Sequence, residues 1–334
     1  QRAIARLRAF AAPPTNWHRC PLTRRAAVLI LLFADRQGDL RVVLTIRSAG
    51  LRNYAGHAAL PGGKADALGE SPFTVARREA YEEIGLPMDD RGLPEGYRVE
   101  HLTELPANLA MTELGVRPCV AYLESPEPSA RNKDPDVARD ILPRLDRCEV
   151  AAVFTAPFYN FLKQHDLHPG TRREFPGDWY QGSWRHWHES AWRMHQFFVP
   201  VSRETAFLAD NPRGSSDPNR PPRTRESTSS STTSEGTSDR SSSSLQPPLP
   251  RSAATGADDA LAQPRYCVFG MTARIVVDCA RVAYDEEPAY EHNSHFGDED
   301  LIDRLLRVGR MGPVRKKGEV LTRDVMVQAK QAKF

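Results

Sequence analysis

Apolar residues fall into short continuous or alternating runs along most of the chain, a pattern that predicts β-strands separated by a few helices. Residues 26–33 form one apolar run and residues 39–45 form another. The dipeptide Gln37-Gly38 between them is typical of a tight turn, so the two runs predict a β-hairpin. Further strands are predicted, in chain order, at residues 97–105, 116–123, 149–154 and 194–201.

A helix is predicted over residues 72–84. Ser71 followed by Pro72 is typical of an N-cap with proline at the first helical position, and Gly85 stands where a left-handed C-terminal cap is expected. One side of this segment is apolar and can dock on a core; it carries Phe73, Val75, Ala76, Ala80 and Ile84. Helical patterns also occur at residues 158–163 and 301–308, and residues 266–280 are typical of a strand end that enters an amphipathic helix.

The other side of the helix at 72–84 is acidic. Glu79, Glu82 and Glu83 stand at i, i+3 and i+4, a spacing that stacks three carboxylates on one helix face. Such like charges repel by a few tenths of a kcal/mol per pair, and a hard divalent cation with oxygen ligands would compensate that repulsion. The alternative is an ordinary solvated helix face with intrahelical ion pairs. Because the acids follow the glycine pair Gly62-Gly63, which can present amide groups to anionic oxygens, we favour the metal site.

The same stretch resembles the box of the Nudix hydrolase family. Arg78-Glu79-Ala80-Tyr81-Glu82-Glu83-Ile84-Gly85 matches the core of that box, and Glu70 precedes Arg78 by the required eight residues. Gly63 lies one residue too early, with six residues rather than five before Glu70. The coenzyme A diphosphatase branch of the family carries that expansion.

A second signature of this branch lies directly upstream, at residues 44–64. It begins with Leu44-Thr45-Ile46-Arg47-Ser48 and ends with Pro61-Gly62-Gly63-Lys64, and His57 stands in it where glutamine is usual. Residues 149–154 resemble another segment of the branch, and residues 266–280 resemble the C-terminal helix of fungal peroxisomal coenzyme A diphosphatases. The resemblance implies an α/β (α+β) fold, the Nudix-type α/β/α sandwich with a mixed sheet.

Diphosphate hydrolysis needs charge neutralisation and an activated water, and one or more Mg²⁺ or Mn²⁺ ions supply both. We assign Glu79 and Glu83 as the main metal ligands, and Glu82 as a third ligand or as the general base; these two roles of Glu82 stay open. Arg78 is expected to orient Glu82 or Glu79. Glu70 is a weaker candidate for the outer shell.

Cationic side chains gather around the glycine pair in sequence. We expect Arg47, Arg52 and Lys64 to contact substrate phosphates beside Gly62 and Gly63, although solvated loop charge is the competing interpretation. Arg117-Pro118 and Glu149 are further candidates for lining the substrate pocket. Residues of this kind are more commonly placed in the core or at the rim.

Composition narrows the classes of partner. The formal net charge of the 334 residues is +2, which gives no reason to expect nucleic acid or an anionic membrane as an electrostatic partner. The five cysteines are scattered without a Cys-x-x-Cys pair, so we expect reduced thiols inside a cell and no structural zinc. The longest apolar run, residues 26–34, is too short to span a bilayer.

The organisation predicted is one Nudix domain with additions. Residues 1–21 form an N-terminal helical extension, for which a helix packed on the domain is favoured over a transit peptide, and residues 22–208 form the first part of the domain. Residues 209–264 are rich in Ser, Thr and Pro and read as a disordered insertion. The domain resumes at residues 265–310, and a basic tail at 311–334 follows. Within the first part, residues 165–192 are rich in His and Trp; aromatic packing is favoured there over a metal site.

The resemblance implies hydrolysis of coenzyme A, or of its acyl or disulfide derivatives, to 3′,5′-ADP and 4′-phosphopantetheine or its derivative. Two alternatives stay open: a Nudix pyrophosphatase for another nucleoside diphosphate derivative such as ADP-ribose, a nucleotide sugar or a dinucleotide, and a binding module without turnover. The residues alone reach only metal-dependent hydrolysis of a diphosphate. A peroxisomal location rests on resemblance, since Ala332-Lys333-Phe334 is no Ser-Lys-Leu signal, and cytoplasmic or mitochondrial locations stay open. The oligomeric state is not predicted.

Overall fold

The computed structural model describes residues 1–48, 56–128, 134–141, 150–167, 178–187, 190–202, 205–208, 264–314 and 322–331. The helices are α1 (Arg2–Ala9), α2 (Pro72–Ile84), α3 (Val137–Asp140), α4 (Gly270–Tyr284), α5 (Glu299–Arg307) and α6 (Arg323–Gln331). Short 3₁₀ turns are η1 (Trp17–Arg19), η2 (Leu22–Arg24), η3 (Asp90–Gly92) and η4 (Phe158–Leu162). The strands are β1 (Arg25–Ala34), β2 (Leu40–Arg47), β3 (Ala58–Ala59), β4 (Gly62–Lys64), β5 (Arg98–Glu104), β6 (Asn108–Leu109), β7 (Gly115–Glu124), β8 (Val150–Pro157), β9 (Tyr180–Trp187), β10 (Ser190–Pro200), β11 (Ala206–Leu208) and β12 (Arg265–Phe269).

The main sheet is mixed. Its strands lie in the order β11-β8-β2-β1-β7-β5, with β1 and β7 parallel and the other neighbours in this order antiparallel. Three short strands extend it, since β3 pairs with β2, β4 with β1 and β6 with β7. The predicted hairpin at 26–33 and 39–45 is confirmed, because β1 and β2 pair antiparallel around the turn.

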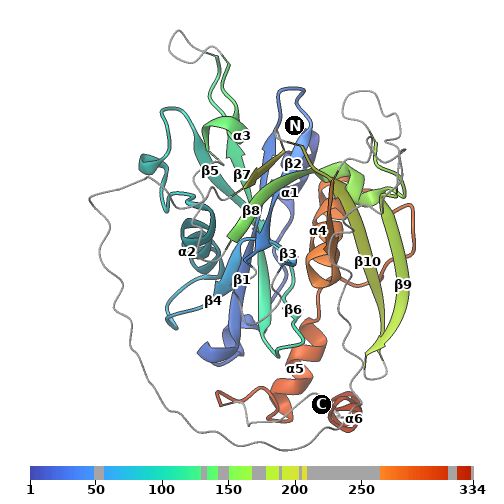
Figure 1. Ribbon diagram of the computed structural model, residues 1–334. Helices are drawn as coiled ribbons and strands as arrows, with labels where there is room; N and C mark the ends of the chain where they lie inside the picture. The colour runs from blue at the N-terminus through green and yellow to red at the C-terminus, as the bar shows by residue number, and fades with distance from the viewer. Residues whose placement is uncertain are drawn as a thin grey trace, which may run out of the picture.

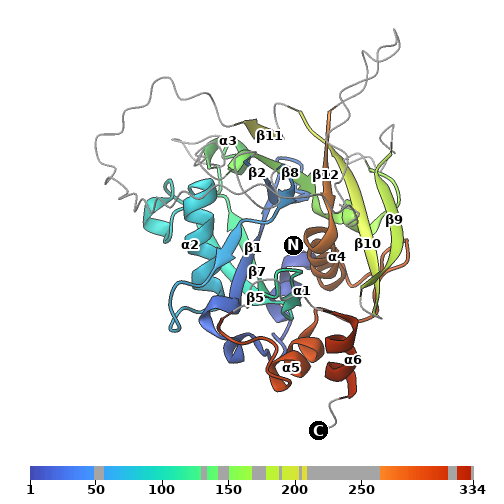
Figure 2. The same cartoon turned by 60° about the horizontal axis from the view of Figure 1, so that its bottom comes forward.

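The residues on the two faces of β1 pack against different helices, which gives the fold a helical layer on each side of the main sheet. Side chains of a strand alternate between faces, so odd-numbered and even-numbered residues of β1 enter different cores. Leu29 and Leu31 share a core with Val75 and Ala80 of α2, whereas Ile30 shares a core with α4. Helices therefore cover both faces of the sheet, α2 on one and α4 on the other (Figure 1, Figure 2). This is the α/β/α sandwich expected from the sequence.

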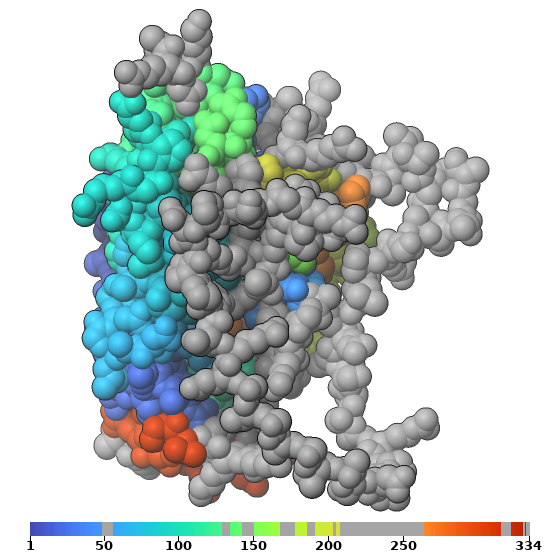
Figure 3. All heavy atoms as spheres, turned by 60° about the vertical axis from the view of Figure 1, so that its left-hand side comes forward, coloured from blue at the N-terminus to red at the C-terminus, as the bar shows by residue number. Residues whose placement is uncertain are grey.

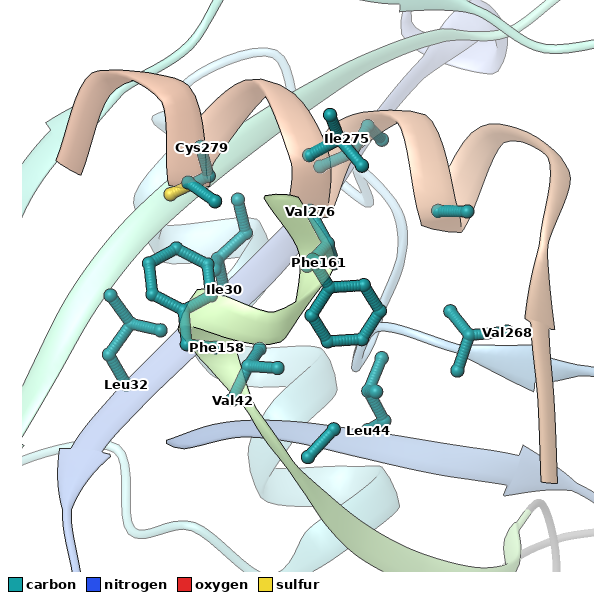
Figure 4. Close-up of a cluster of buried hydrophobic side chains, with 14 of the residues drawn as sticks. Ile30, Leu32, Val42, Leu44, Phe158, Phe161, Val268, Ile275, Val276 and Cys279 are labelled. Carbon is teal, nitrogen blue, oxygen red and sulfur yellow. The ribbon is translucent and has the colours of Figure 1, made fainter. Parts of the chain in front are cut away.

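Helix α4 closes the second core. In the close-up, side chains of α4, η4 and β12 meet those of β1 and β2; the labelled ones are Ile30, Leu32, Val42, Leu44, Phe158, Phe161, Val268, Ile275, Val276 and Cys279 (Figure 4). Residues before and after the segment 209–263 thus share one hydrophobic core. That segment, predicted as a disordered insertion, lies outside the described residues.

A second antiparallel sheet lies beyond α4. Its order is β12-β10-β9, and in both ribbon views β9 and β10 lie on the far side of α4 from the main sheet (Figure 1, Figure 2). The predicted aromatic packing in the His/Trp-rich stretch is found at Trp179, which is buried against Phe161 and Phe197. Trp184, by contrast, is 43% exposed.

Both ends of the chain pack as helices. Ile4 and Leu7 of α1 are buried in the core that α4 closes, so the packed helix favoured by the sequence is what the structure contains. Within the predicted basic tail over 311–334, residues 323–331 form α6, and residues 315–321 lie outside the described residues. Its apolar residues Met326 and Ala329, three apart on one helix face, are buried with Ile302 of α5. None of the helices in the described ranges is long and apolar enough to cross a membrane.

Truncating Phe161 tests the core. This side chain is fully buried between α4, Trp179 and Phe197, so we expect Phe161→Ala to lower the free energy of unfolding by about 3–5 kcal/mol. Leu68 is 66% exposed, and Leu68→Ala should change stability by less than about 0.5 kcal/mol. Urea denaturation of both variants measures the difference. Similar losses in the two variants would contradict this packing.

Candidate active site

The glycine pair lies on the short strand β4, pressed against β1. Gly62 pairs with Val28 and Gly63 with Ala27 in antiparallel register. A Cβ atom at Gly62 would collide with the backbone of Ala27 and would lie 2.6 Å from Cα of Val28. Only glycine therefore allows β4 to approach β1 this closely.

Helix α2 delivers two carboxylates to this glycine pair. The helix begins after Ser71, whose hydroxyl accepts from the Thr74 amide, and ends at Gly85 in the left-handed conformation, as predicted. Glu83 is buried, and its Oε2 accepts a hydrogen bond from the Gly62 amide at 3.1 Å. Glu79 lies over the neighbouring glycine, because a Cβ atom on Gly63 would come within 2.5 and 2.6 Å of its two carboxylate oxygens. Glu79 and Glu83 thus converge on adjacent backbone positions.

Arg78 links this helix to the preceding loop. Its Nη1 donates to Glu79 Oε1 at 3.0 Å, its Nε donates to Glu70 Oε1 at 3.0 Å, and its Nη2 donates to the carbonyl of Lys64 at 2.7 Å. Glu82 is more distant at 3.7 Å and its side chain is 39% exposed. The guanidinium therefore holds the carboxylate of Glu79, and Glu82 stays at the rim.

The Glu70 carboxylate stabilises the loop between the glycine pair and α2 through hydrogen bonds to its backbone. Its Oε2 accepts from the amides of Asp66 and Ala67 at 2.7 and 3.1 Å, and its Oε1 accepts from Arg78. Partial burial acts to raise the pKa of Glu70, but the amide of Ala67 and the guanidinium of Arg78 outweigh it and hold the pKa below its usual value. These contacts place Glu70 as a support of Arg78 rather than beside Glu83.

The predicted phosphate-binding cations differ in their placement. Arg47 ends β2, its Nη1 lies 3.9 Å from Glu83 Oε1, and its buried Nε has no hydrogen-bond partner among the described residues. Lys64 is exposed at the end of β4. Arg52 lies outside the described residues. Arg47 therefore lies at the carboxylate pair, and Lys64 lies next to Gly63.

The carboxylate pair fits a hard divalent cation in its chemistry, because such ions prefer several carboxylate oxygens. Glu79 and Glu83 supply these from one helix face at the glycine pair. Nowhere in the described part of the chain do three His, Cys, Asp or Glu side chains gather closely enough to hold a metal ion. Glu82 is the member that stands apart, since it faces Arg78 at the rim. The structure therefore brings Glu79 and Glu83 to the glycine pair and leaves Glu82 apart from them.

Other candidate residues lie elsewhere. Arg117 is buried and bridges Glu104 and Glu299 at 3.0 and 3.1 Å, so its contacts join β5, β7 and α5 and belong to the core rather than to a pocket. Glu149 lies outside the described residues. Two contacts near the glycine pair were not foreseen: the hydroxyl of Thr272 in α4 donates to the Ala58 carbonyl at 3.4 Å, and Phe269 meets the ring of His57 edge-on. They join positions more than 200 residues apart, which no local pattern reveals.

Comparison with known proteins is consistent with this geometry. A family model, NUDIX domain, matches residues 23–141. The chain is also 32% identical over 164 residues to NudL of Cronobacter sakazakii, an uncharacterized Nudix hydrolase, and the match covers 47% of this chain and 73% of that protein. The chain belongs to the Nudix hydrolase family. The matched region of this Nudix chain contains the glycine pair, α2 and the parallel strands β1 and β7.

Two further relatives of this Nudix chain have names that state a substrate. It is 36% identical over 165 residues to peroxisomal coenzyme A diphosphatase 1 of Saccharomyces cerevisiae, a match that covers 48% of each chain. It is 34% identical over 147 residues to peroxisomal coenzyme A diphosphatase ndx-8 of Caenorhabditis elegans, which covers 44% of this chain and 53% of that protein. The chain spans about half the length of these two relatives.

Substitution of Gly63 tests the carboxylate pair without removing any acid. In Gly63→Ala the new methyl group would collide with the Glu79 carboxylate and displace it, so we expect divalent-cation affinity to fall about 10–100-fold. Isothermal titration with Mn²⁺ measures it.

Gly69 provides the matched control. A Cβ atom there meets nothing within 4 Å, so Gly69→Ala should bind Mn²⁺ like the parent chain. Unchanged Mn²⁺ affinity in Gly63→Ala would show that Glu79 does not hold the ion.

Proposed function

We propose that this Nudix chain is a metal-dependent hydrolase that cleaves the diphosphate of coenzyme A, or of an acyl or disulfide derivative, to 3′,5′-ADP and 4′-phosphopantetheine or its derivative. The convergence of Glu79 and Glu83 on Gly62-Gly63 carries the hydrolytic part of this proposal. The names of the yeast and nematode relatives favour coenzyme A as the substrate and a peroxisomal location.

The reaction breaks a phosphoric anhydride bond, so negative charge grows on the phosphate oxygens while a weak nucleophile attacks. A bound Mg²⁺ or Mn²⁺ supplies charge neutralisation and lowers the pKa of a coordinated water. Glu79 and Glu83 would hold the ion, and the amides of the glycine pair would lie beside the phosphates. Glu82, exposed at the rim, would act as a general base or become a third ligand.

Arg78 and Arg47 have different proposed roles. Arg78 holds Glu79 and is itself held by Glu70, so it positions a ligand and need not touch substrate. Arg47 lies at Glu83, and its Nε has no hydrogen-bond partner within the described ranges, which suits it to a phosphate oxygen. Lys64 and Arg52 are the further candidates for phosphate contacts.

Glu83→Gln tests the mechanism. The amide keeps the shape of the side chain but removes its charge, so we expect Mn²⁺-dependent turnover of coenzyme A to fall at least about 100-fold. Steady-state assays of released 3′,5′-ADP measure it. Glu127 is exposed in the loop after β7, and Glu127→Gln should retain full activity. Equal activity in the two variants would remove Glu83 from the mechanism.

The substrate is tested separately. Incubation of the chain with Mn²⁺ and equal concentrations of coenzyme A and ADP-ribose, with product analysis by chromatography, should give faster formation of 3′,5′-ADP than of AMP. Faster cleavage of ADP-ribose would assign the chain to another nucleoside diphosphate derivative. No turnover of either compound, with Mn²⁺ bound, would indicate a binding module.

A further inference from the structure

Four side chains form a continuous hydrogen-bonded row between the second sheet and α4. Tyr180 Oη lies 3.0 Å from His195 Nδ1, His195 Nε2 lies 2.8 Å from His292 Nδ1, and His292 Nε2 lies 2.8 Å from Asp278 Oδ1. His195 is fully buried, and the side chains of His292 and Asp278 are 3% and 4% exposed. We call these four residues the relay. Its members come from β9, β10, α4 and the segment after α4.

The directions of these hydrogen bonds depend on one another. The carboxylate of Asp278 can only accept, so His292 donates from Nε2, and in its neutral form it accepts at Nδ1. His195 then donates from Nε2 and accepts at Nδ1, which leaves the Tyr180 hydroxyl as the donor to His195. When a solvent proton reaches the Tyr180 oxygen, the original hydroxyl proton can pass to His195 Nδ1 and the His195 Nε2 proton can pass to His292 Nδ1. His292 is then charged, each bond is reversed, and the new Tyr180 hydroxyl proton points away from the relay.

The outer end of the relay borders an open hollow. The hollow has a volume of about 630 Å³, and its lining includes Gln164, Tyr180, Arg193, Tyr290 and Glu291. It lies on the second sheet beyond α4, whereas Glu79 and Glu83 lie on the α2 side of the main sheet. The surface on the α2 side is seen in Figure 3, where residues 56–100 form the light blue to cyan area.

Arg193 is the cation of this hollow. Its side chain is 12% exposed, its guanidinium lies beside the Tyr180 hydroxyl and over the Trp184 ring, and its buried Nε has no partner among the described residues. Gly182 makes room for this arrangement, since a Cβ atom there would lie 2.7 Å from Arg193 Nη2 and collide with the Tyr180 hydroxyl.

Among the described residues, the acid that pairs with this arginine is Glu291. Glu291 Oε2 lies 3.1 Å from Arg193 Nη1, but the Glu291 side chain is 67% exposed. Glu291 Oε2 also accepts from the Trp184 indole at 2.6 Å. Because the carboxylate itself is largely exposed, another carboxylate or phosphate oxygen can reach Arg193 and replace it.

We propose that the hollow is a second binding site, for the oxyanion group of a small molecule, and that binding is coupled to uptake of one proton by His292. An oxyanion bound to Arg193 would lie beside the Tyr180 oxygen. As long as the Tyr180 hydroxyl donates to His195, the lone pairs of its oxygen repel the bound anion. Protonation of His292 reverses the relay, so that the Tyr180 hydroxyl donates to the anion. The proton comes from solvent, and the added positive charge balances the bound negative charge.

The surroundings disfavour an added proton on His195. Burial, followed by the charges of His292, Arg193 and Arg274, lowers the pKa of His195 to about 3, whereas His292 directly contacts the carboxylate of Asp278. The titratable and charged groups that face the two histidines are Tyr180 of β9, Arg193 of β10, Arg274, Asp278 and Arg281 of α4, and Tyr290, Glu291 and His295 of the segment that follows.

The test is calorimetric titration of the full chain with sodium sulfate at pH 7.5 and constant ionic strength, in two buffers with different ionisation enthalpies. Sulfate is a suitable probe because it does not titrate near neutral pH. We expect binding with uptake of about one proton. Repeating the titration with acetate separates recognition of a tetrahedral group from that of a carboxylate.

Four variants sharpen the test. Arg193→Gln should weaken sulfate binding at least about 10-fold, and Glu291→Gln should strengthen it several-fold because the internal competitor is gone. His292→Gln should bind sulfate without proton uptake, and Arg185→Gln, at an exposed position on β9, should behave like the parent chain. Circular dichroism and thermal melting confirm folding of each variant.

Three results would overturn the proposal: no binding of sulfate or acetate to the parent chain, binding that is equal in Arg193→Gln and Arg185→Gln, or binding without proton uptake. None of these readouts involves the hydrolytic reaction, so they are independent of the function proposed above.

Discussion

The site depends on the close approach of helix α2 to the two glycines of β4, Gly62 and Gly63. Gly62 and Gly63 let β4 lie against β1, and they let the carboxylates of Glu83 and Glu79 reach the β4 backbone. Any larger residue at these positions would separate the elements. The rest of the fold serves this contact, since β1 lies at the centre of the mixed sheet and packs α2 on one face and α4 on the other.

Charge balance at the site rests on arginine. Two carboxylates one helical turn apart repel each other, and here Arg78 compensates Glu79 while Arg47 lies near Glu83. A divalent cation would compensate the same charges more strongly, because it would contact both carboxylates directly. Arg47 would then be free to move toward a phosphate oxygen, while Arg78 keeps Glu79 in position.

Local sequence signals predicted α2, whereas α6 and the relay depend on contacts between residues far apart in the sequence. Ser71, Pro72 and Gly85 set the bounds of α2 through interactions within a few residues, and the structure has the same bounds. Helix α6 was missed because its few apolar residues sit among charged and polar ones, and their value is seen only once α5 supplies a partner surface. Likewise, the members of the relay are far apart in sequence, so no spacing rule brings them together.

The central claim is that Glu79 and Glu83 hold a divalent cation beside the glycine pair, and diffraction from a crystal soaked in Mn²⁺ tests it most directly. We expect an anomalous peak within about 2.0–2.3 Å of an oxygen from each carboxylate. Mn²⁺ bound elsewhere, with neither Glu79 nor Glu83 as a ligand, would contradict it.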